Sequence, residues 1–437
     1  MSGMHRAPMT LLRPSAMEDV IGSSEKLRGK LVSPEFRRHL FFLGGIPRPS
    51  VFYALGRGSF DELWEEEVRE KWFNQETGLS PDELIRLIAH AVGGRKIEPS
   101  ANSEIKGLKW GRLFDEGLCM MLDSGQLGIP YCVFRLASGI DMYRRGLSLA
   151  AKCMIQVLQY LRQHVDDVLY DKEPWQSWET FSACFFALRV NALLLLDMTQ
   201  CPFSLLCQHA IRNGCDVEVL LCPMEVHAIC ESLGADLKPM VTDKKHNTSL
   251  DWVQGSPSGV RYCLLNGTSG QGVDMFSALP LADSLPGALC LYNAQQKVVS
   301  ASLGSAVASK LLAKADVRPL CLPAGSLCIR GLFSIMASFT QSADDLPSNS
   351  FVLSYRQHEA FHGSLAGHPA CKTWVDVNFD NRSTLRLLSS VRVLAENVEE
   401  ERKKQRFRSV DAFADFCSQK GHMLSLDDEL RIVAHCE

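Results

Sequence analysis

The apolar run from Phe181 to Met198 constrains the fold more than any other part of the chain, because it carries Arg189 and Asn191 near its middle. A membrane-spanning helix needs about 20 consecutive, predominantly apolar residues. This run covers barely 18 residues and includes a full positive charge. It therefore predicts a helix buried in the core of a globular protein, and we expect no membrane partner.

The composition is that of an ordinary globular protein. The chain has 437 residues, 46% of them hydrophobic, and 46 Lys+Arg against 50 Asp+Glu give a formal net charge of −4. Such a length suits two to three domains of about 150 residues each, and the apolar content excludes wholesale disorder. The near-neutral balance argues against a uniformly basic nucleic-acid coat and leaves a local basic groove open.

The 16 cysteines are scattered from Cys119 to Cys436 without a C-x-x-C pair. In a long chain this pattern favours reduced, buried thiols over a secreted disulfide framework. Residues 1–15 are basic and lack the apolar segment of a secretory signal peptide. We therefore expect an intracellular protein, in the nucleus or the cytoplasm.

The chain changes from helical to mixed patterning near residues 171–174. Before this boundary, Ser80-Pro81 opens a periodic helix that Gly93-Gly94 ends, and residues 109–133 indicate a helix, a turn and a short strand in a winged-helix-like unit. After it, a helix over 178–196 precedes several strand-like runs. The runs cover residues 218–221, 260–265, 288–292, 317–322 and 350–355, with a helix over 302–312 among them.

This alternation predicts the fold class, α plus α/β: an N-terminal helical bundle followed by a mixed α/β domain. We expect four regions: a disordered tail over 1–17, a helical region over 18–172, the α/β domain over 173–392 and a charged helical tail over 393–437. Within the α/β domain, we expect the strands at 260–265 and 288–293 to be adjacent. The helix from Trp178 should pack against their sheet.

The first candidate site is the turn Gly44-Gly45-Ile46-Pro47-Arg48 after an apolar helix. Glycines and proline make a tight turn between helices, and the planar guanidinium of Arg48 suits a phosphate. The alternative is a helix corner with a surface arginine. No phosphate-binding loop is found, since Gly22 to Lys30 has the wrong spacing and no Ser or Thr after the lysine. We therefore expect no ATP hydrolysis.

The second candidate site pairs Asp274, after a glycine-rich loop, with Gln295 and Lys297 at the end of a later strand. An acid on one strand and Glu/Gln-x-Lys on the next is the arrangement of metal-dependent nucleases. Alternation puts Gln295 and Lys297 on one strand face. Asp274 and Gln295 would hold Mg²⁺, Lys297 would stabilise the phosphate charge or orient water, and Glu179 would complete the set. The alternative is a surface Asp and a surface Lys without chemistry.

The third candidate site is His358-Glu359-Ala360-Phe361-His362. Two histidines at i and i+4 of a helix bind Zn²⁺ in metalloproteases, with the Glu as general base, and His368 falls where a third ligand would lie. Gly363 would end this helix at once, so a solvated loop or short helix carrying histidines is the alternative. Cys230 and His227 lie in an apolar, helix-like run, which indicates packing and not a nucleophile.

The order of these segments resembles that in Crinkler and retrotransposon-hot-spot proteins. Residues 36–49 (FRRHLFFLGGIPRP) look like the sensor-2 region of their STAND-type NTPase, and residues 110–131 resemble the winged segment that follows it. Residues 175–196 look like the first helix of the restriction-endonuclease-like, PD-(D/E)xK domain that ends many of them. Residues 264–276 and 289–297 are similar to the strands carrying its acid and its Gln-x-Lys.

The resemblance implies Asp274, Gln295, Lys297 and Glu179 as a Mg²⁺-dependent nuclease set, with Arg48 as a remnant phosphate sensor. The chain departs from the family in two ways: the Walker motifs are missing, as in a truncated member, and Gln295 replaces the commoner Glu. We therefore expect an intracellular effector whose nuclease domain acts on nucleic acid. A non-catalytic module that binds protein partners is the alternative, and a zinc metalloprotease is a distant third.

Overall fold

The computed structural model describes most of residues 78–228, 255–266, 273–297, 304–316, 322–334, 342–371 and 388–424, with short gaps, and scattered residues elsewhere. Contacts divide the chain into two compact units, residues 1–137 with 363–437, and residues 138–362. This division differs from the predicted boundaries, because helix α10 (Leu149–Leu161) belongs to the same unit as the sheet.

A seven-stranded mixed sheet forms the centre of the second unit, in the order β4-β11-β10-β9-β8-β7-β6. β8 and β4 run antiparallel to their neighbours, and the other pairs are parallel. The predicted mixed sheet within residues 175–390 is therefore confirmed. The strands are β4 (Ile211–Asn213), β6 (Met224–Ala228), β7 (Arg261–Leu265), β8 (Met275–Pro280), β9 (Leu289–Lys297), β10 (Leu327–Ser334) and β11 (Ser350–Leu353).

The predicted adjacency of the strands at 260–265 and 288–293 is wrong. β8 lies between β7 and β9 and pairs antiparallel with both. Consecutive strands with short connections usually pair with each other, and the unpredicted strand at Met275–Pro280 comes between the two expected ones in the chain. Asp274 therefore precedes β8 and does not end β7.

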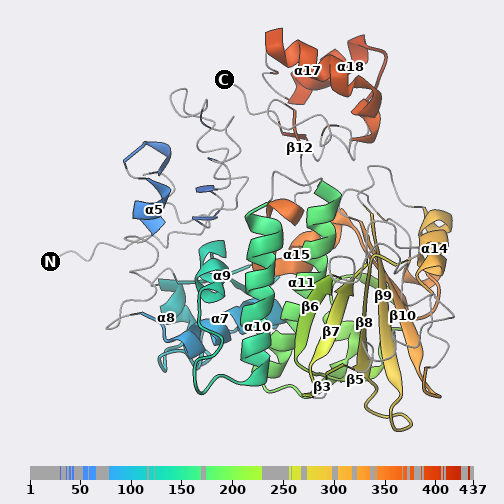
Figure 1. Cartoon of the computed structure of the whole chain (residues 1–437). Helices are drawn as coiled ribbons and strands as arrows, with labels where there is room; N and C mark the ends of the chain where they lie inside the picture. The colour runs from blue at the N-terminus through green and yellow to red at the C-terminus, as the bar shows by residue number, and fades with distance from the viewer. Residues whose placement is uncertain are drawn as a thin grey trace. The chain divides into compact units, whose positions relative to one another are not determined.

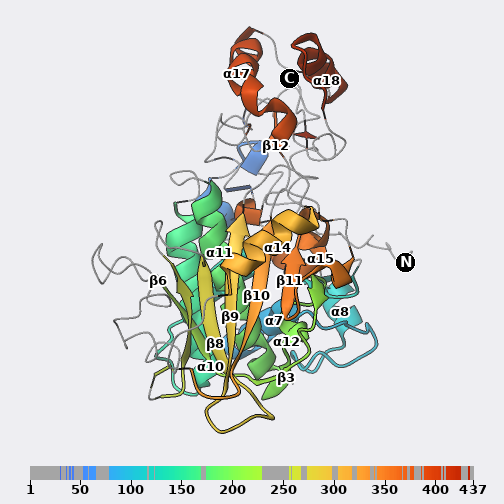
Figure 2. The same cartoon turned by 90° about the vertical axis from the view of Figure 1, so that its right-hand side faces the viewer.

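Helices cover both faces of the sheet. α10 and α11 (Pro174–Leu195) lie on one face and α14 (Ser305–Lys314) on the other, as Figures 1 and 2 show. Successive side chains of β9 point to opposite faces. The Tyr292 ring lies 4.5 Å from the Phe186 ring of α11, whereas Asn293 donates to the Ala315 carbonyl at the end of α14 over 3.0 Å.

The apolar run expected in the core forms most of α11. Gln176–Leu195 is long and apolar enough to cross a membrane, but 78% of its most apolar window is buried inside the structure. Its fully buried Arg189 donates to the carbonyls of Leu206 and Phe361, and its guanidinium lies 4.6 Å from the rings of Phe185 and Phe361. Burial lowers the pKa of Arg189 to about 9. Protein carbonyls and aromatic rings thus replace the water around this charge.

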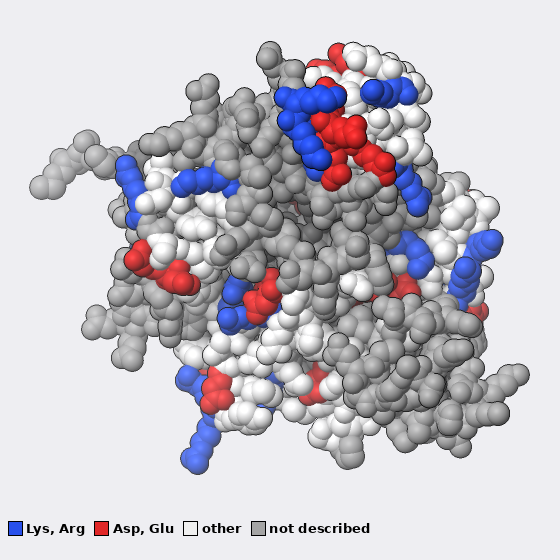
Figure 3. All heavy atoms as spheres, turned by 45° about the horizontal axis from the view of Figure 1, so that its top comes forward, with Lys and Arg blue, Asp and Glu red and all other residues white. Residues whose placement is uncertain are grey.

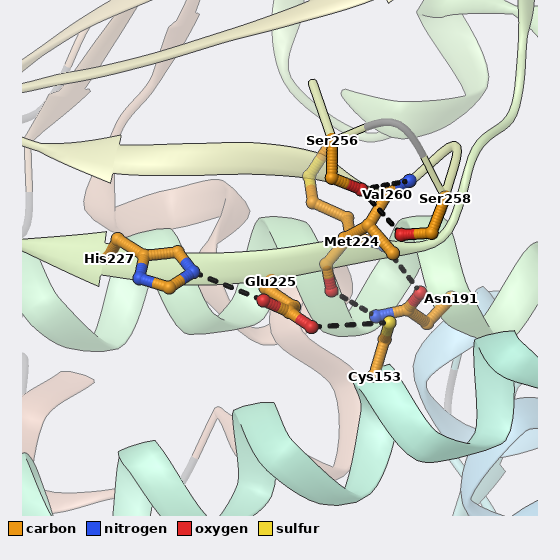
Figure 4. A network of polar contacts seen from close by, with 8 residues as sticks. All are labelled: Cys153, Asn191, Met224, Glu225, His227, Ser256, Ser258 and Val260. Carbon is orange, nitrogen blue, oxygen red and sulfur yellow. Dashed lines mark hydrogen bonds and ion pairs between the residues drawn. The ribbon is translucent and has the colours of Figure 1, made fainter. Parts of the chain in front are cut away.

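Asn191 ties α11 to the edge strand β6. Its side-chain amide donates to the Met224 carbonyl over 2.7 Å and accepts from the Met224 amide over 2.9 Å, as Figure 4 shows. On the same strand, the Glu225 carboxylate lies 3.1 Å from the ring Nε2 of His227 and 3.9 Å from the Cys153 thiol of α10. The helix-like run predicted around His227 is wrong for its described part, because that part is strand β6.

The predicted caps of helix α7 (Pro81–Gly93), in the first unit, are confirmed. The Ser80 hydroxyl accepts from the Glu83 amide, the Glu83 carboxylate accepts from the Ser80 amide, and Gly94 follows with a left-handed φ of 70°. The other elements of this unit are α5 (Phe60–Leu63), α8 (Trp110–Asp115), β1 (Met120–Met121), β2 (Leu127–Gly128), α9 (Tyr131–Ser138), β12 (Val375–Asp376), α17 (Ala395–Lys404), α18 (Val410–Gln419) and β13 (Ile432–Val433).

The second unit also contains a small two-stranded sheet and two short helices outside the main sheet. These elements are β3 (Gln200–Pro202), α12 (Phe203–Leu206), β5 (Glu218–Leu220) and α15 (His358–His362).

Candidate functional site

Asp274 and Lys297 meet where β8 begins and β9 ends. The antiparallel pairing of these strands places Met275 opposite Ala294, and the Asp274 amide donates to the Ala294 carbonyl over 2.9 Å. The Lys297 ammonium then lies 3.3 Å from Asp274 Oδ2, which also accepts from the Gln296 amide over 2.6 Å. Both donors use Oδ2, so Asp274 Oδ1 takes no hydrogen bond from a described residue.

Gln295 and Lys297 lie on the same face of β9 as Asn293, which is the face that α14 covers. This is the shared face that strand alternation predicted. The Gln295 side chain is 4% exposed, and that of Lys297 is 34% exposed. Gln296 turns to the opposite face, where its amide nitrogen lies 3.9 Å from the Met275 sulfur and its carbonyl oxygen is buried without a hydrogen bond.

Glu179 approaches the pair from the first turns of α11. It is half-buried and makes no hydrogen bond or ion pair with a described residue. Burial raises the pKa of Glu179 to about 8, the negative charge of Asp274 adds to the rise, and the positive charge of Lys297 opposes it. The structure therefore brings Glu179, Asp274 and Lys297 into one electrostatic cluster.

The donor set of this cluster fits Mg²⁺. This ion prefers oxygen ligands, keeps several waters and is held by one or two carboxylates. Glu179 and Asp274 Oδ1 supply such oxygens, and a divalent cation would offset the burial and the repulsion by Asp274 that together raise the pKa of Glu179. Among the described residues no three His, Cys, Asp or Glu side chains are grouped for a metal. Gln295 lies on the face of β9 that α14 covers, whereas α11, which carries Glu179, covers the other face, so the structure does not bring Gln295 and Glu179 together on one side of the sheet.

The histidines of the third candidate lie in the short helix α15, as the alternative to the zinc site predicted, but they are buried and not solvated. His358 and His362 are 3% and 1% exposed, with their Nδ1 atoms 3.2 Å apart, and Nε2 of His358 lies 3.3 Å from the Ser334 carbonyl. Both ring nitrogens of His358 thus have protein partners. Glu359 is exposed, away from the buried imidazoles. This arrangement does not favour a zinc protease.

The structure does not describe three of the predicted features. The turn carrying Arg48, the glycine-rich loop at 267–272 and Cys230 lie outside the described residues. His368 belongs to the first unit, where its Nδ1 accepts from the Ala370 amide over 3.0 Å.

Sequence reasoning missed two residues that adjoin members of the cluster, Trp178 in the chain and Ser334 in the sheet. Ser334 ends β10 opposite Lys297, and Trp178 directly precedes Glu179. Strand β10 itself was not predicted, so no sequence signal placed Ser334 beside Lys297. The size and position of Trp178 in an apolar helix signal burial only.

Comparisons of the chain with protein-family profiles, curated proteins and solved structures find no match. Function is therefore inferred from the geometry of the chain itself.

Proposed function

We propose that residues 138–362 form a Mg²⁺-dependent nuclease domain of the PD-(D/E)xK kind, which hydrolyses phosphodiester bonds. The 3.3 Å contact between Lys297 and Asp274 at the paired ends of β8 and β9 carries this proposal. Glu179 supports it, because the charges of both residues act on its carboxyl group. An acid, a lysine on the next strand and a helix carboxylate are the groups that the resemblance implied.

The residues of the cluster have complementary tasks in such a reaction. Bound Mg²⁺ supplies Lewis-acid polarisation of a phosphoryl oxygen and a water of lowered pKa. Asp274, oriented by the Gln296 amide, would hold the ion through Oδ1. Lys297 places a partly exposed positive charge beside it, which would stabilise the negative charge that develops on the phosphate. Glu179, with its pKa raised to about 8, is suited to accept a proton near neutral pH.

One observation favours the non-catalytic alternative. Gln295 supplies a neutral amide where the family commonly has a carboxylate, and its side chain is only 4% exposed. A site with fewer carboxylates binds Mg²⁺ more weakly. On this alternative, the same unit would serve as an interaction module for protein partners.

The mixed surface charge argues against binding of nucleic acid over a uniformly basic surface and favours recognition at the site alone. On the face of the molecule that Figure 3 draws, basic and acidic side chains are interspersed over the described part. On α17, for example, Arg402 lies 3.7 Å from Glu399 and Lys404 lies 3.6 Å from Glu401. Phosphate contacts would then come mainly from the site, and the affinity for nucleic acid would fall only weakly with added salt.

A cleavage assay tests the proposed function. The full chain is incubated with supercoiled plasmid and with single-stranded RNA in Mg²⁺ or Mn²⁺, with EDTA as the metal-free control. Asp274→Asn should reduce cleavage to background, since it removes the anionic ligand. Asp283→Asn is the matched control, because Asp283 is exposed in the turn at the other end of the β8–β9 hairpin. Absence of cleavage by the parent protein in either metal would favour the interaction module.

The N-terminal part would be an NTPase-like region that does not hydrolyse ATP. The missing phosphate-binding loop supports this proposal, since its amides and lysine hold the triphosphate in P-loop enzymes. Calorimetry with the full chain should show no ATP binding at micromolar concentration. A tight, Mg²⁺-dependent ATP site would overturn it.

A further inference from the structure

The two buried histidines of α15 form a directed pair of hydrogen bonds. A carbonyl oxygen only accepts, so the contact of His358 Nε2 with the Ser334 carbonyl at 3.3 Å requires a proton on Nε2. Burial lowers the pKa of His358 to about 4, so the ring is neutral and its Nδ1 accepts. His362 Nδ1 is then the donor, 3.2 Å from both His358 Nδ1 and the His358 carbonyl.

One end of this pair reaches the strand next to Lys297. Ser334 is the last residue of β10, and the parallel pairing of β10 with β9 places it opposite Lys297. The Ser334 hydroxyl is buried without a hydrogen bond. The contact from His358 to the Ser334 carbonyl is therefore a polar contact between α15 and this strand end.

The same imidazole packs on the residue that precedes Glu179. The ring of His358 lies 5.1 Å from that of Trp178, and the ring of His362 lies 5.8 Å from it. Trp178 is fully buried, and its indole N–H has no hydrogen-bond partner. The start of α11 is thus held against α15 here by ring packing.

We propose that His358 is a positioning residue that sets the distance between Glu179 and Lys297. His358 packs on Trp178, the residue before Glu179, and contacts the carbonyl of Ser334, which is paired with Lys297. This inference rests on the proposed function for its catalytic consequence, but the spacing of the two charges is a property of the fold. Displacement of catalytic groups by about 1 Å can reduce a rate by about 10²-fold.

A matched pair of variants separates the two contacts of His358. In His358→Gln the amide nitrogen can occupy the position of Nε2 and donate to the Ser334 carbonyl. His358→Phe keeps a ring against Trp178 and loses the donor. We expect His358→Phe to lower kcat about 10- to 100-fold with KM unchanged, and His358→Gln to keep kcat within about threefold of the parent value. His227→Phe, at the far edge of the sheet, should leave kcat unchanged.

A second measurement needs no cleavage. A double-mutant cycle of Glu179→Gln and Lys297→Met, followed by urea unfolding at pH 9, gives the coupling between these two charges. The cycle is repeated in the His358→Phe background. If His358 sets their spacing, the coupling should change at least twofold there and remain close to the parent value with His358→Gln.

The outcomes distinguish this inference from the proposed function. An unchanged coupling in His358→Phe overturns the inference whether or not the protein cleaves nucleic acid, and so does a kcat that stays at the parent value. A parent protein that never cleaves, combined with a changed coupling, overturns the nuclease proposal and supports the spacing role. Equal loss of stability in both variants without a change in coupling would mean that His358 only fills the core.

Discussion

The Lys297 ammonium lies 3.3 Å from the Asp274 carboxylate, although the two residues are 23 positions apart in the chain. The antiparallel β8–β9 hairpin produces this contact, because Asp274 immediately precedes β8 and Lys297 is the last residue of β9. With side chains 34% and 17% exposed, the ion pair lies in a partly solvated position. Such pairs typically stabilise a fold by no more than about 1 kcal/mol. The pair therefore matters more for chemistry than for folding.

Lys297→Met should separate these two effects. We expect cleavage to slow by about 10²- to 10³-fold, the range found when one preorganised electrostatic donor is removed from an active site. The free energy of unfolding should change by less than about 1 kcal/mol. Cleavage kinetics and urea unfolding measure the two quantities, and Lys310→Met on the exposed side of α14 is the control. A rate equal to that of the parent would exclude a role for this ammonium in the reaction.

The two neighbouring glutamines of β9 provide a test of the metal site. Gln295 shares a face with Lys297, whereas Gln296 points to the opposite face beside Met275. Gln295→Glu should therefore add a carboxylate on the face of β9 that carries Lys297 and raise the affinity for Mg²⁺. Gln296→Glu should not raise it. Calorimetric titration with Mg²⁺ measures both, and equal affinities in the two variants would contradict the assignment of Gln295.

Glu179 should make stability depend on pH. Its pKa is raised from 4.5 to about 8, so between these values the folded state holds a proton that the unfolded state has lost. The free energy of unfolding must then fall as pH rises through this window. Glu179→Gln should remove that fall and stabilise the protein at pH 9 by about 1–2 kcal/mol, a figure reduced for the partial exposure of the group. Urea unfolding from pH 5 to 9 measures it; parallel curves for both proteins would refute the shift.

Much of the fold follows from local sequence signals. The caps of α7 and the apolar length of α11 act over a few residues, and both were predicted correctly. Strand alternation likewise placed Gln295 and Lys297 on one face. Such signals depend only on neighbours in the chain.

The errors came from contacts between distant segments. β8 was missed because Met275–Pro280 is a short apolar run without alternation, buried almost throughout, so its period does not distinguish it from a loop or a helix turn. The expectation of a helix at β6 is wrong for another reason, since its buried Met224 and Val226 do alternate with Glu225 and His227, as a strand requires. The neighbourhood of the site, where Ser334 lies opposite Lys297, depends on the pairing of β9 with β10. Strand order is a tertiary property that local patterns do not contain.

The side chain of Asn191 joins α11 to β6. Asn191 and Met224 are fully buried, and the Asn191 amide satisfies both the amide and the carbonyl of Met224. Asn191→Ala would leave two buried backbone groups without partners, each costing about 1–3 kcal/mol. We expect the free energy of unfolding to fall by about 2–4 kcal/mol. Thr180→Ala on the same helix is the control, because its hydroxyl bonds only to the Gln176 carbonyl one turn earlier, and the change there should stay within about 0.5 kcal/mol. Urea unfolding of both variants measures these changes, and a loss below about 1 kcal/mol for Asn191→Ala would show that water or a shifted side chain replaces the amide.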